Sequence, residues 1–310
     1  MSAPHPPQRV LVLDSDGYLG TRVVRALAAT SWATAVVVPL ERLTGALRDP
    51  RDLAGLLADA DAVINCTGGQ PAAIHGVARS LYRAAARVPG RRIVHLGSMT
   101  VYGPATGTLD ERAPLAAVPG AYAAAQLAAD TLARQCPDAV VLRLGAEYGA
   151  GHRPLSETLA KLLRAGRIGA LGAAGDGPCN AVHVDDVAHA AVAALQAPDA
   201  GGRVYNLVST EVLSWNRYLA LYAAALGVPL KTIGPGRWAW ERLSAPLRKL
   251  AQVAARALGL EEPVLVSPSL ARSLASPLRI DGRRAELELG LRYTPHAEGL
   301  AEAASACRRG

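Results

Sequence analysis

Residues 10–20 have the sequence VLVLDSDGYLG, in which an apolar run leads into a glycine-containing turn and the start of a helix. Gly17 and Gly20 have the spacing of the second and third glycines of a dinucleotide-binding turn, with Asp14 at the position of the first. Such a turn directs backbone N–H groups and the positive end of the helix toward a diphosphate. The alternative is a tight turn that binds no ligand. The residues predicted to bind a cofactor here are Asp14, Gly17, Tyr18, Leu19 and Gly20.

Strands and helices alternate after this turn. Short apolar runs at 35–38, 62–65, 92–96 and 140–144 are separated by longer helical stretches. Uninterrupted apolar strands are typical of parallel sheets that are covered on both faces. We therefore predict an α/β fold with a Rossmann-type doubly wound parallel sheet.

The rhythm of the sequence changes after Gly149, where a glycine-rich region begins. We expect a Rossmann dinucleotide-binding domain made of residues 1–149 plus 179–228. A smaller, interleaved C-terminal substrate-binding cap is expected from residues 150–178 plus 229–310. The chain is long enough for one such domain with its cap.

The 310-residue chain carries a formal net charge of +7 and has only 4% aromatic residues. Its arginines are dispersed, which argues against nucleic-acid binding and favours a small anionic ligand. The four cysteines show no metal-ligand spacing, so no metal site is predicted. We find neither an apolar run of membrane-spanning length nor a signal peptide, so we expect a cytoplasmic protein without membrane contact.

Several motifs together resemble the extended short-chain dehydrogenase/reductases, also called the NAD-dependent epimerase/dehydratase family. They occur in the family's order at 10–20, 61–68 (DAVINCTG), 92–103 (RIVHLGSMTVYG), 122–130 (YAAAQLAAD), 140–151 (VVLRLGAEYGAG) and 183–188 (HVDDVA). The chain resembles an atypical member, because Asp14 replaces the first glycine and YxxxQ replaces the family's YxxxK.

The resemblance implies that Ser98 and Tyr122 bind the substrate oxygen and that Tyr122 exchanges its proton. Gln126 stands where the family has a lysine, one helical turn after the tyrosine. A lysine ammonium stabilises the phenolate, whereas an amide has no full charge, so Tyr122 needs another source of activation. Gln126 can still hydrogen-bond a ribose hydroxyl of the cofactor.

The resemblance also places Cys66, Thr67 and Gly68 beside the cofactor, and it places Tyr102 and Tyr148 at the substrate. Cofactor choice is usually read at the end of the second strand, where an acid selects NAD and an arginine selects NADP. That end holds Pro39, followed by Glu41 and Arg42. Both cofactors stay open, and Arg42 together with the net charge slightly favours NADP.

The leading hypothesis is an NAD(P)-dependent oxidoreductase or epimerase-like enzyme for a small carbonyl or hydroxyl substrate, in secondary metabolism. Leu142-Arg143 lacks the asparagine that follows in relatives acting on nucleotide sugars, which argues against such a substrate. Asp14 and Gln126 motivate two alternatives: a non-redox cyclase, dehydratase or lyase, and a non-catalytic nucleotide-sensing protein. We expect a homodimer formed through the small-residue helices at 73–88 and 121–135.

His183, Asp185 and Asp186 precede a helix and allow two interpretations. They could form a metal or acid–base cluster, or the acids could stabilise the helix N-terminus against its dipole. We favour the second interpretation.

Overall fold

The computed structural model describes residues 8–45, 49–116, 120–244 and 264–309, with the single positions 247, 248, 250, 252, 254, 255 and 258. Residues 1–7, the start of the expected Rossmann segment, lie outside this set. Among the described residues, no helix combines the length and the apolar character needed to cross a bilayer.

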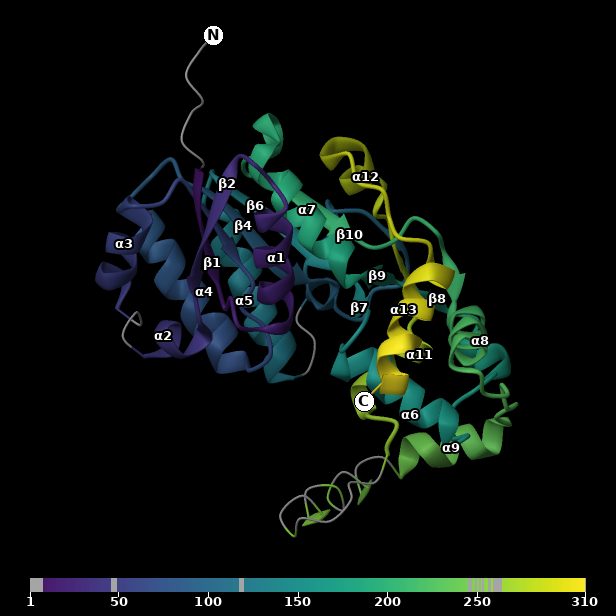
Figure 1. Ribbon diagram of the computed structural model, residues 1–310. Coiled ribbons are helices and arrows are strands. Elements are labelled where there is room, and N and C mark those ends of the chain that lie inside the picture. Colours follow the sequence, from purple (N-terminus) through teal and green to yellow (C-terminus); the bar gives the residue numbers. More distant parts are fainter. Residues whose placement is uncertain are drawn as a thin grey trace.

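A six-stranded parallel sheet forms the centre of the molecule (Figure 1). Its spatial order is β2-β1-β3-β4-β6-β10, so the direction of winding reverses between β1 and β3. Its strands are β1 (Gln8–Leu13), β2 (Ala33–Val38), β3 (Ala62–Asn65), β4 (Arg92–Ser98), β6 (Ala139–Leu144) and β10 (Val204–Leu207). This arrangement confirms the predicted doubly wound fold, in which ligands bind at the carboxyl ends of the strands beside the reversal.

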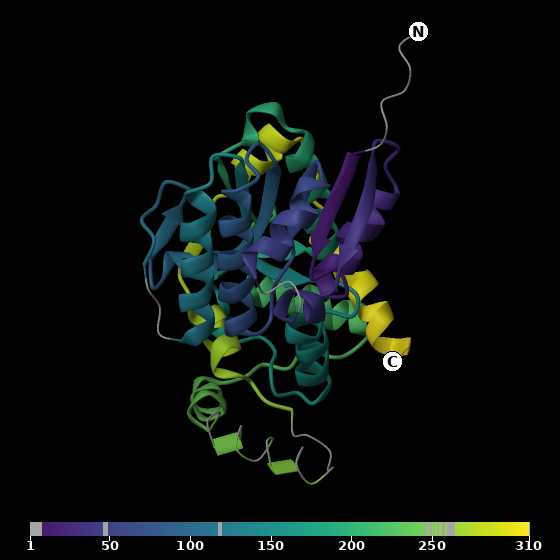
Figure 2. The same ribbon diagram turned by 90° about the vertical axis from the view of Figure 1, so that its left-hand side faces the viewer.

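Helices cover both faces of the sheet. One face carries α1 (Tyr18–Ala28), α7 (Val184–Gln196) and α12 (Arg283–Leu289), and the other carries α3 (Pro50–Ala58), α4 (Pro71–Ala85) and α5 (Ala121–Arg134). Figure 2 views the second face, where α4 packs against both α3 and α5.

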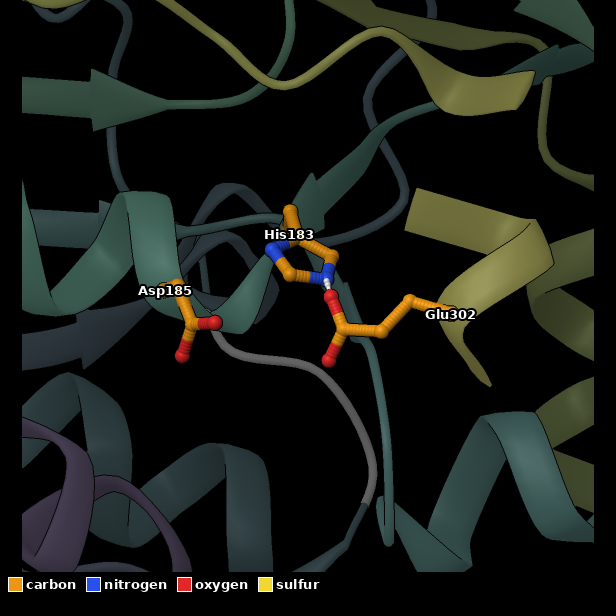
Figure 3. Close-up of side chains that lie close together, drawn as sticks. All are labelled: His183, Asp185 and Glu302. Carbon is orange, nitrogen blue, oxygen red and sulfur yellow. Dashed lines mark ion pairs between the residues drawn. The ribbon is translucent and has the colours of Figure 1, made fainter. Parts of the chain in front are cut away.

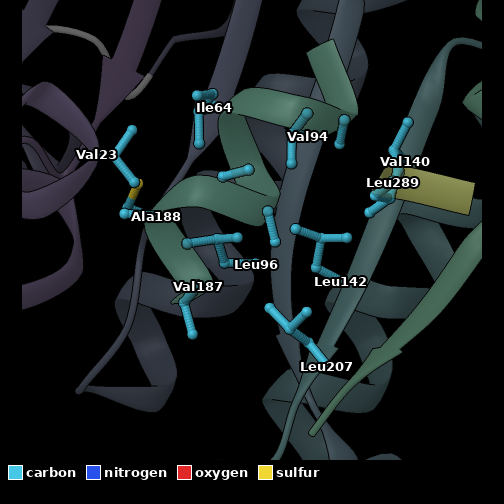
Figure 4. Packing of buried hydrophobic residues seen from close by; sticks show 14 of the residues in the cluster. Val23, Ile64, Val94, Leu96, Val140, Leu142, Val187, Ala188, Leu207 and Leu289 are labelled. Carbon is cyan, nitrogen blue, oxygen red and sulfur yellow. The ribbon is translucent and has the colours of Figure 1, made fainter. Parts of the chain in front are cut away.

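Strand β1 shows why the sheet strands are apolar throughout. Val10 and Val12 pack into the cluster under α1 and α7, while Leu11 and Leu13 pack into the cluster under α3 and α4. Successive side chains of a strand point to opposite faces, and here both faces are buried. Figure 4 shows the first cluster, in which Val94, Leu142 and Leu207 come from three neighbouring strands.

A second apolar cluster lies beside the sheet and forms the cap. Its helices are α6 (Thr158–Arg164), α8 (Trp215–Leu226), α9 (Pro235–Leu243), α11 (Pro268–Ala275) and α13 (His296–Arg309). Trp215, Tyr218 and Tyr148 meet edge to face within it.

Short strand pairs join the cap to the sheet domain. They are β7 (Ala146–Tyr148) with β9 (Ala181–His183), β8 (Pro178–Cys179) with β11 (Leu213–Ser214), and β5 (Gly107–Leu109) with β12 (Leu278–Ile280). Single helical turns complete the described elements: α2 (Leu40–Thr44), η1 (Met99–Tyr102), η2 (Arg153–Glu157), η3 (Gly172–Gly175) and η4 (Pro198–Ala200).

The boundaries between the sheet domain and the cap differ from those expected from the sequence. Helix α8 falls within the expected Rossmann segment, yet its buried residues, including Leu219, belong to the cap cluster. Helix α12 falls within the expected cap segment, yet Ala285 and Leu289 pack on the sheet. The apolar face of each helix decides which core it joins, and the order along the chain does not.

A fully buried ion pair ties β6 to α5. The Arg143 guanidinium donates to both carboxylate oxygens of Asp130, at 2.8 and 3.1 Å, and both side chains are about 1% exposed. Arg143 also donates to the Tyr102 hydroxyl at 2.8 Å, and that hydroxyl donates to Asn206 Oδ1 at 2.5 Å. The network joins four elements: η1, α5, β6 and β10.

We expect Arg143→Met to lower the free energy of unfolding by about 3–5 kcal/mol, because it leaves the Asp130 carboxylate buried without its partner. Urea unfolding measures this change. The control is Arg112→Met, which breaks a pair with Asp110 in which Arg112 is 88% exposed, so the free energy of unfolding should stay close to that of the unmodified protein. Equal losses in the two variants would contradict a structural role for the buried pair.

Candidate active site

The turn between β1 and α1 is built around Asp14. Its φ of 60° lies in the left-handed region, which aspartate tolerates better than most side chains. This explains how an aspartate can stand at the position of the first glycine. Gly20 is required by contact, since a Cβ there would lie 2.0 Å from the Asp14 carbonyl oxygen.

The Asp14 side chain lies inside the turn. Its carboxylate accepts a hydrogen bond from the Gly68 amide at 3.2 Å, and a Cβ on Gly17 would lie 2.7 Å from it. Burial raises the pKa of Asp14 to about 6, the Gly68 hydrogen bond opposes this, and the neighbouring Asp16 adds to it. The carboxyl therefore changes its charge just below neutral pH.

The N-terminus of α1 is open toward an anion. Gly17 is the N-cap residue and offers no side-chain cap, and the first turn contains no acidic residue. The first amides of a helix lack intrahelical partners and carry partial positive charge. Asp16 points away to accept from the Leu40 amide at 2.9 Å, at the end of β2.

Tyr18 and the end of β3 frame this turn. The Tyr18 hydroxyl donates to the Ala150 carbonyl at 2.9 Å, which links the turn to the start of the cap.

Cys66 is buried and burial raises the pKa of its thiol, so it is not a nucleophile. Thr67 donates from its amide and its hydroxyl to Asn65 Oδ1, which fixes the backbone that presents Gly68 to Asp14.

The predicted catalytic side chains Ser98, Tyr122 and Gln126 come together at the carboxyl end of β4. Gln126 Nε2 donates to the Tyr122 hydroxyl at 3.1 Å, as expected one helical turn apart. The Ser98 hydroxyl accepts from the Thr100 hydroxyl and amide, at 3.1 and 3.3 Å, and its own proton is directed to the Tyr122 hydroxyl. Tyr122 is 41% exposed, so a ligand can reach it.

Tyr122 is a weak acid in this setting. Its pKa is raised first by burial among protein atoms and then by the Glu147 carboxylate, and hydrogen bonds from Gln126 and Ser98 only oppose this. The phenol is therefore protonated at neutral pH. Since its oxygen already accepts from Gln126, its proton is free to be donated.

Gln126 has one unsatisfied atom. The side chain is 4% exposed, and its Oε1 is buried without a hydrogen-bond partner in the described structure. A buried acceptor without a donor costs about 1–3 kcal/mol, so a ligand hydroxyl at this point would be stabilised. A nucleotide ribose supplies such a donor, and the uncapped α1 N-terminus suits its diphosphate. The residues present therefore fit a dinucleotide cofactor.

The structure buries the side chains of Tyr102 and Tyr148, which were predicted to contact the substrate. Tyr102 is 1% exposed, and its hydroxyl is used by Arg143 and Asn206. Tyr148 is fully buried in the cap cluster, and its hydroxyl lies 3.0 Å from His296 Nδ1. Both tyrosines stabilise the fold because their hydroxyl groups find partners inside the protein.

A residue without a predicted role, Glu147, lies beside Tyr122 instead. It is the middle residue of β7, so its side chain points opposite to the buried Tyr148. Burial raises the pKa of Glu147 to about 7, although 30% of the side chain remains exposed. The sequence did contain a signal for Glu147, because it is the single charged residue in the stretch 144–151.

Figure 3 shows His183, Asp185 and Glu302, whose potential ligand atoms lie within 4.8 Å of one another. His183 Nε2 is 3.5 Å from Glu302, whereas Asp185 lies 3.3 Å from the Arg22 guanidinium, which already supplies positive charge. Asp186 accepts from the Thr294 amide and hydroxyl. These contacts join α7 to α1 and to the C-terminal segment, and Asp185 and Asp186 lie in the first turn of α7.

The sequence model of the NAD dependent epimerase/dehydratase family matches residues 10–207. The chain belongs to this family. A curated relative, 2'-dehydrokanamycin reductase of Streptomyces kanamyceticus, is 32% identical over 259 residues, which are 76% of this chain and 72% of the relative.

Solved structures of the epimerase/dehydratase family show the same fold. UDP-glucuronic acid 4-epimerase from Bacillus cereus, in complex with UDP-glucuronic acid and NAD, has a TM-score of 0.69 at 19% identity, covering 97% of this chain and 99% of that one. RMD from Pseudomonas aeruginosa, complexed with NADPH, has a TM-score of 0.69 at 19% identity, covering 98% and 100%. Members of this fold thus bind either nicotinamide cofactor.

We expect Asp14→Asn to tighten NADPH binding about tenfold above pH 6, because it removes a charge that repels the diphosphate at about 1–2 kcal/mol. In the unmodified protein the affinity should fall as the pH rises through about 6, where Asp14 ionises. Fluorescence titration at about pH 5 and about pH 8 measures both effects. The control is Asp59→Asn at an exposed position, and matching behaviour of the two variants would contradict the prediction.

We expect Gln126→Lys to raise the rate of hydride transfer about tenfold near neutral pH and to shift the pH–rate profile downward, because an ammonium lowers the pKa of Tyr122. Steady-state rates across the pH range measure this change. Gln135→Lys, at the exposed end of the same helix, serves as the control. Unchanged turnover in Gln126→Lys would show that residue 126 is outside the proton-relay position.

Proposed function

We propose that this protein is an NAD(P)H-dependent reductase that converts a ketone on a small molecule into a secondary alcohol. The observation that carries the proposal is the contact of Gln126 with the Tyr122 hydroxyl, which leaves a protonated phenol as a hydrogen-bond donor. A protonated acid suits carbonyl reduction, in which a proton must be delivered to the forming alkoxide. The 2'-dehydrokanamycin reductase relative, whose name describes reduction of a dehydro compound, supports the same direction.

Ser98, Tyr122 and Gln126 would each have a separate role in the reaction. The bound cofactor would supply a hydride to the carbonyl carbon. Ser98 would donate a hydrogen bond to the carbonyl oxygen and hold it beside the Tyr122 hydroxyl. Tyr122 would transfer its proton to that oxygen as the hydride arrives, and the resulting phenolate would regain a proton from solvent. Gln126 would stabilise the phenolate as a hydrogen-bond donor, at less than the strength of a charged group.

The cofactor would be held by the start of α1 and by the end of β3, with Gln126 Oε1 accepting from a ribose hydroxyl. We favour NADP because the exposed side chain of Arg42 follows β2, where a 2′-phosphate is usually bound. Asp16, which could bind a ribose hydroxyl nearby, already accepts from the Leu40 amide.

We also propose a homodimer in which α4 and α5 of each copy pair as a four-helix bundle. These two helices pack side by side on one face of the sheet and are rich in alanine, which permits close approach.

The test is titration with NADPH and NADH, followed by turnover with a panel of small ketones. We expect NADPH binding, its oxidation by at least one ketone, and a loss of about 10²–10⁴-fold in rate in Tyr122→Phe without loss of cofactor binding. The control is Tyr205→Phe, which removes a hydroxyl that donates to Glu288 Oε2 at 2.9 Å.

Two other results would overturn the reductase. Cofactor binding without hydride transfer would favour one of the two alternatives that Asp14 and Gln126 motivate. These are a non-redox cyclase, dehydratase or lyase, and a non-catalytic nucleotide-sensing protein. Absence of binding at millimolar NADPH and NADH would remove the cofactor assignment altogether.

A further inference from the structure

Among the residues that the structure describes, Glu147 has no arginine or lysine within ion-pair distance. Among the described residues, the positively chargeable group within ion-pair distance is His152, whose Nε2 lies 3.7 Å from Oε2. Burial and the nearby Arg22 lower the pKa of His152 to about 4, so His152 is neutral at neutral pH and the contact is not an ion pair. The distance alone would suggest a salt bridge, but the protonation state of the histidine excludes one.

Glu147 lies near the start of α1, because the His152 ring that it contacts packs on the Tyr18 ring, with 5.0 Å between the ring centroids. Its charge contributes to raising the pKa of Tyr18 and of Tyr122. Its side chain is 30% exposed, so a ligand can reach it. A partly buried carboxylate loses hydration without gaining a partner, which is unfavourable until a cation binds.

We infer that Glu147 binds a positively charged nitrogen on the substrate, so the ketone reduced by this protein carries an ammonium group close to the carbonyl. This inference rests on the proposed reductase activity. It contrasts with the overall charge of +7, which by itself would favour anionic substrates. A charge-assisted hydrogen bond between an ammonium and a carboxylate is strong and orients the substrate as well as holding it.

The charge of Glu147 gives the inference a pH signature. Burial raises its pKa to about 7, so below that pH the carboxyl becomes neutral and the preference for a cationic ketone should decline. The groups that face it are His152, Tyr18 and Tyr122, and all three are neutral between about pH 5 and pH 9. Beyond Tyr18, the Arg22 guanidinium is paired with Asp185 at 3.3 Å, and Glu302 acts on Tyr18 from α13.

The experiment compares ketones of matched shape and different charge. The pair is 4-(dimethylamino)cyclohexanone and 4-isopropylcyclohexanone, extended to the same pair of substituents on cyclopentanone. The tertiary ammonium stays charged up to about pH 9, as does a lysine. The quantity measured is the ratio of kcat/KM for the charged ketone to that for the neutral ketone, at saturating NADPH.

We expect the unmodified protein to prefer the charged ketone, and Glu147→Gln to reduce the ratio about 10- to 100-fold. The ratio should fall below about pH 7 in the unmodified protein and stay flat in Glu147→Gln. The control is Glu298→Gln on the exposed surface of α13, which should keep the ratio of the unmodified protein.

Three outcomes would overturn the assignment or its foundation. If neutral ketones are reduced and the charged ones are not preferred, the inference fails while the reductase stands. If Glu147→Gln weakens binding of NADP⁺ but not of NADPH, measured by titration without substrate, the cation is the oxidised nicotinamide ring and not the substrate. If no ketone is reduced at all, the proposed function itself has failed.

Discussion

The constraint on which the rest of the site depends is the close contact between the end of β1 and the start of α1. The Asp14 carbonyl lies where a side chain on Gly20 would be, so the helix can begin at Tyr18, directly above the strand. This brings the uncapped amides of α1 to the edge of the sheet at which Ser98 and Gly68 also lie. A bulkier turn would move the helix away from that edge and separate the diphosphate site from the catalytic side chains.

The sequence predicted the fold well because it depends on patterns that local residues determine. Apolar runs with both faces buried indicate parallel strands, and the parallel sheet has the predicted winding. The four-residue spacing of Tyr122 and Gln126 predicted a contact that any α-helix would produce. The sequence also showed Asp14 at a position where the family has glycine, and its positive φ is a conformation that aspartate tolerates better than most side chains.

The features that the sequence could not predict depend on contacts between distant segments. Nothing local distinguishes a tyrosine that faces a ligand from one whose hydroxyl meets Arg143 or His296 in the interior, so the burial of Tyr102 and Tyr148 could not be predicted. The exchange of α8 and α12 between the two cores has the same origin. Glu147 is important because the described residues place no arginine or lysine within ion-pair distance of it. Recognising this requires the positions of its neighbours in space, which the sequence does not give.

The placement of α12 and α13 also has a consequence for synthesis of the protein. Ala285 and Leu289 complete the cluster on the sheet, and Leu300 and Ala303 complete the cluster of the cap. Because the nascent chain leaves the ribosome N-terminus first, neither core can close until α12 and α13 have been synthesised. Until then, the strands of the sheet are present but part of their apolar surface stays exposed, and this is the interval in which chaperones would have the most surface to bind.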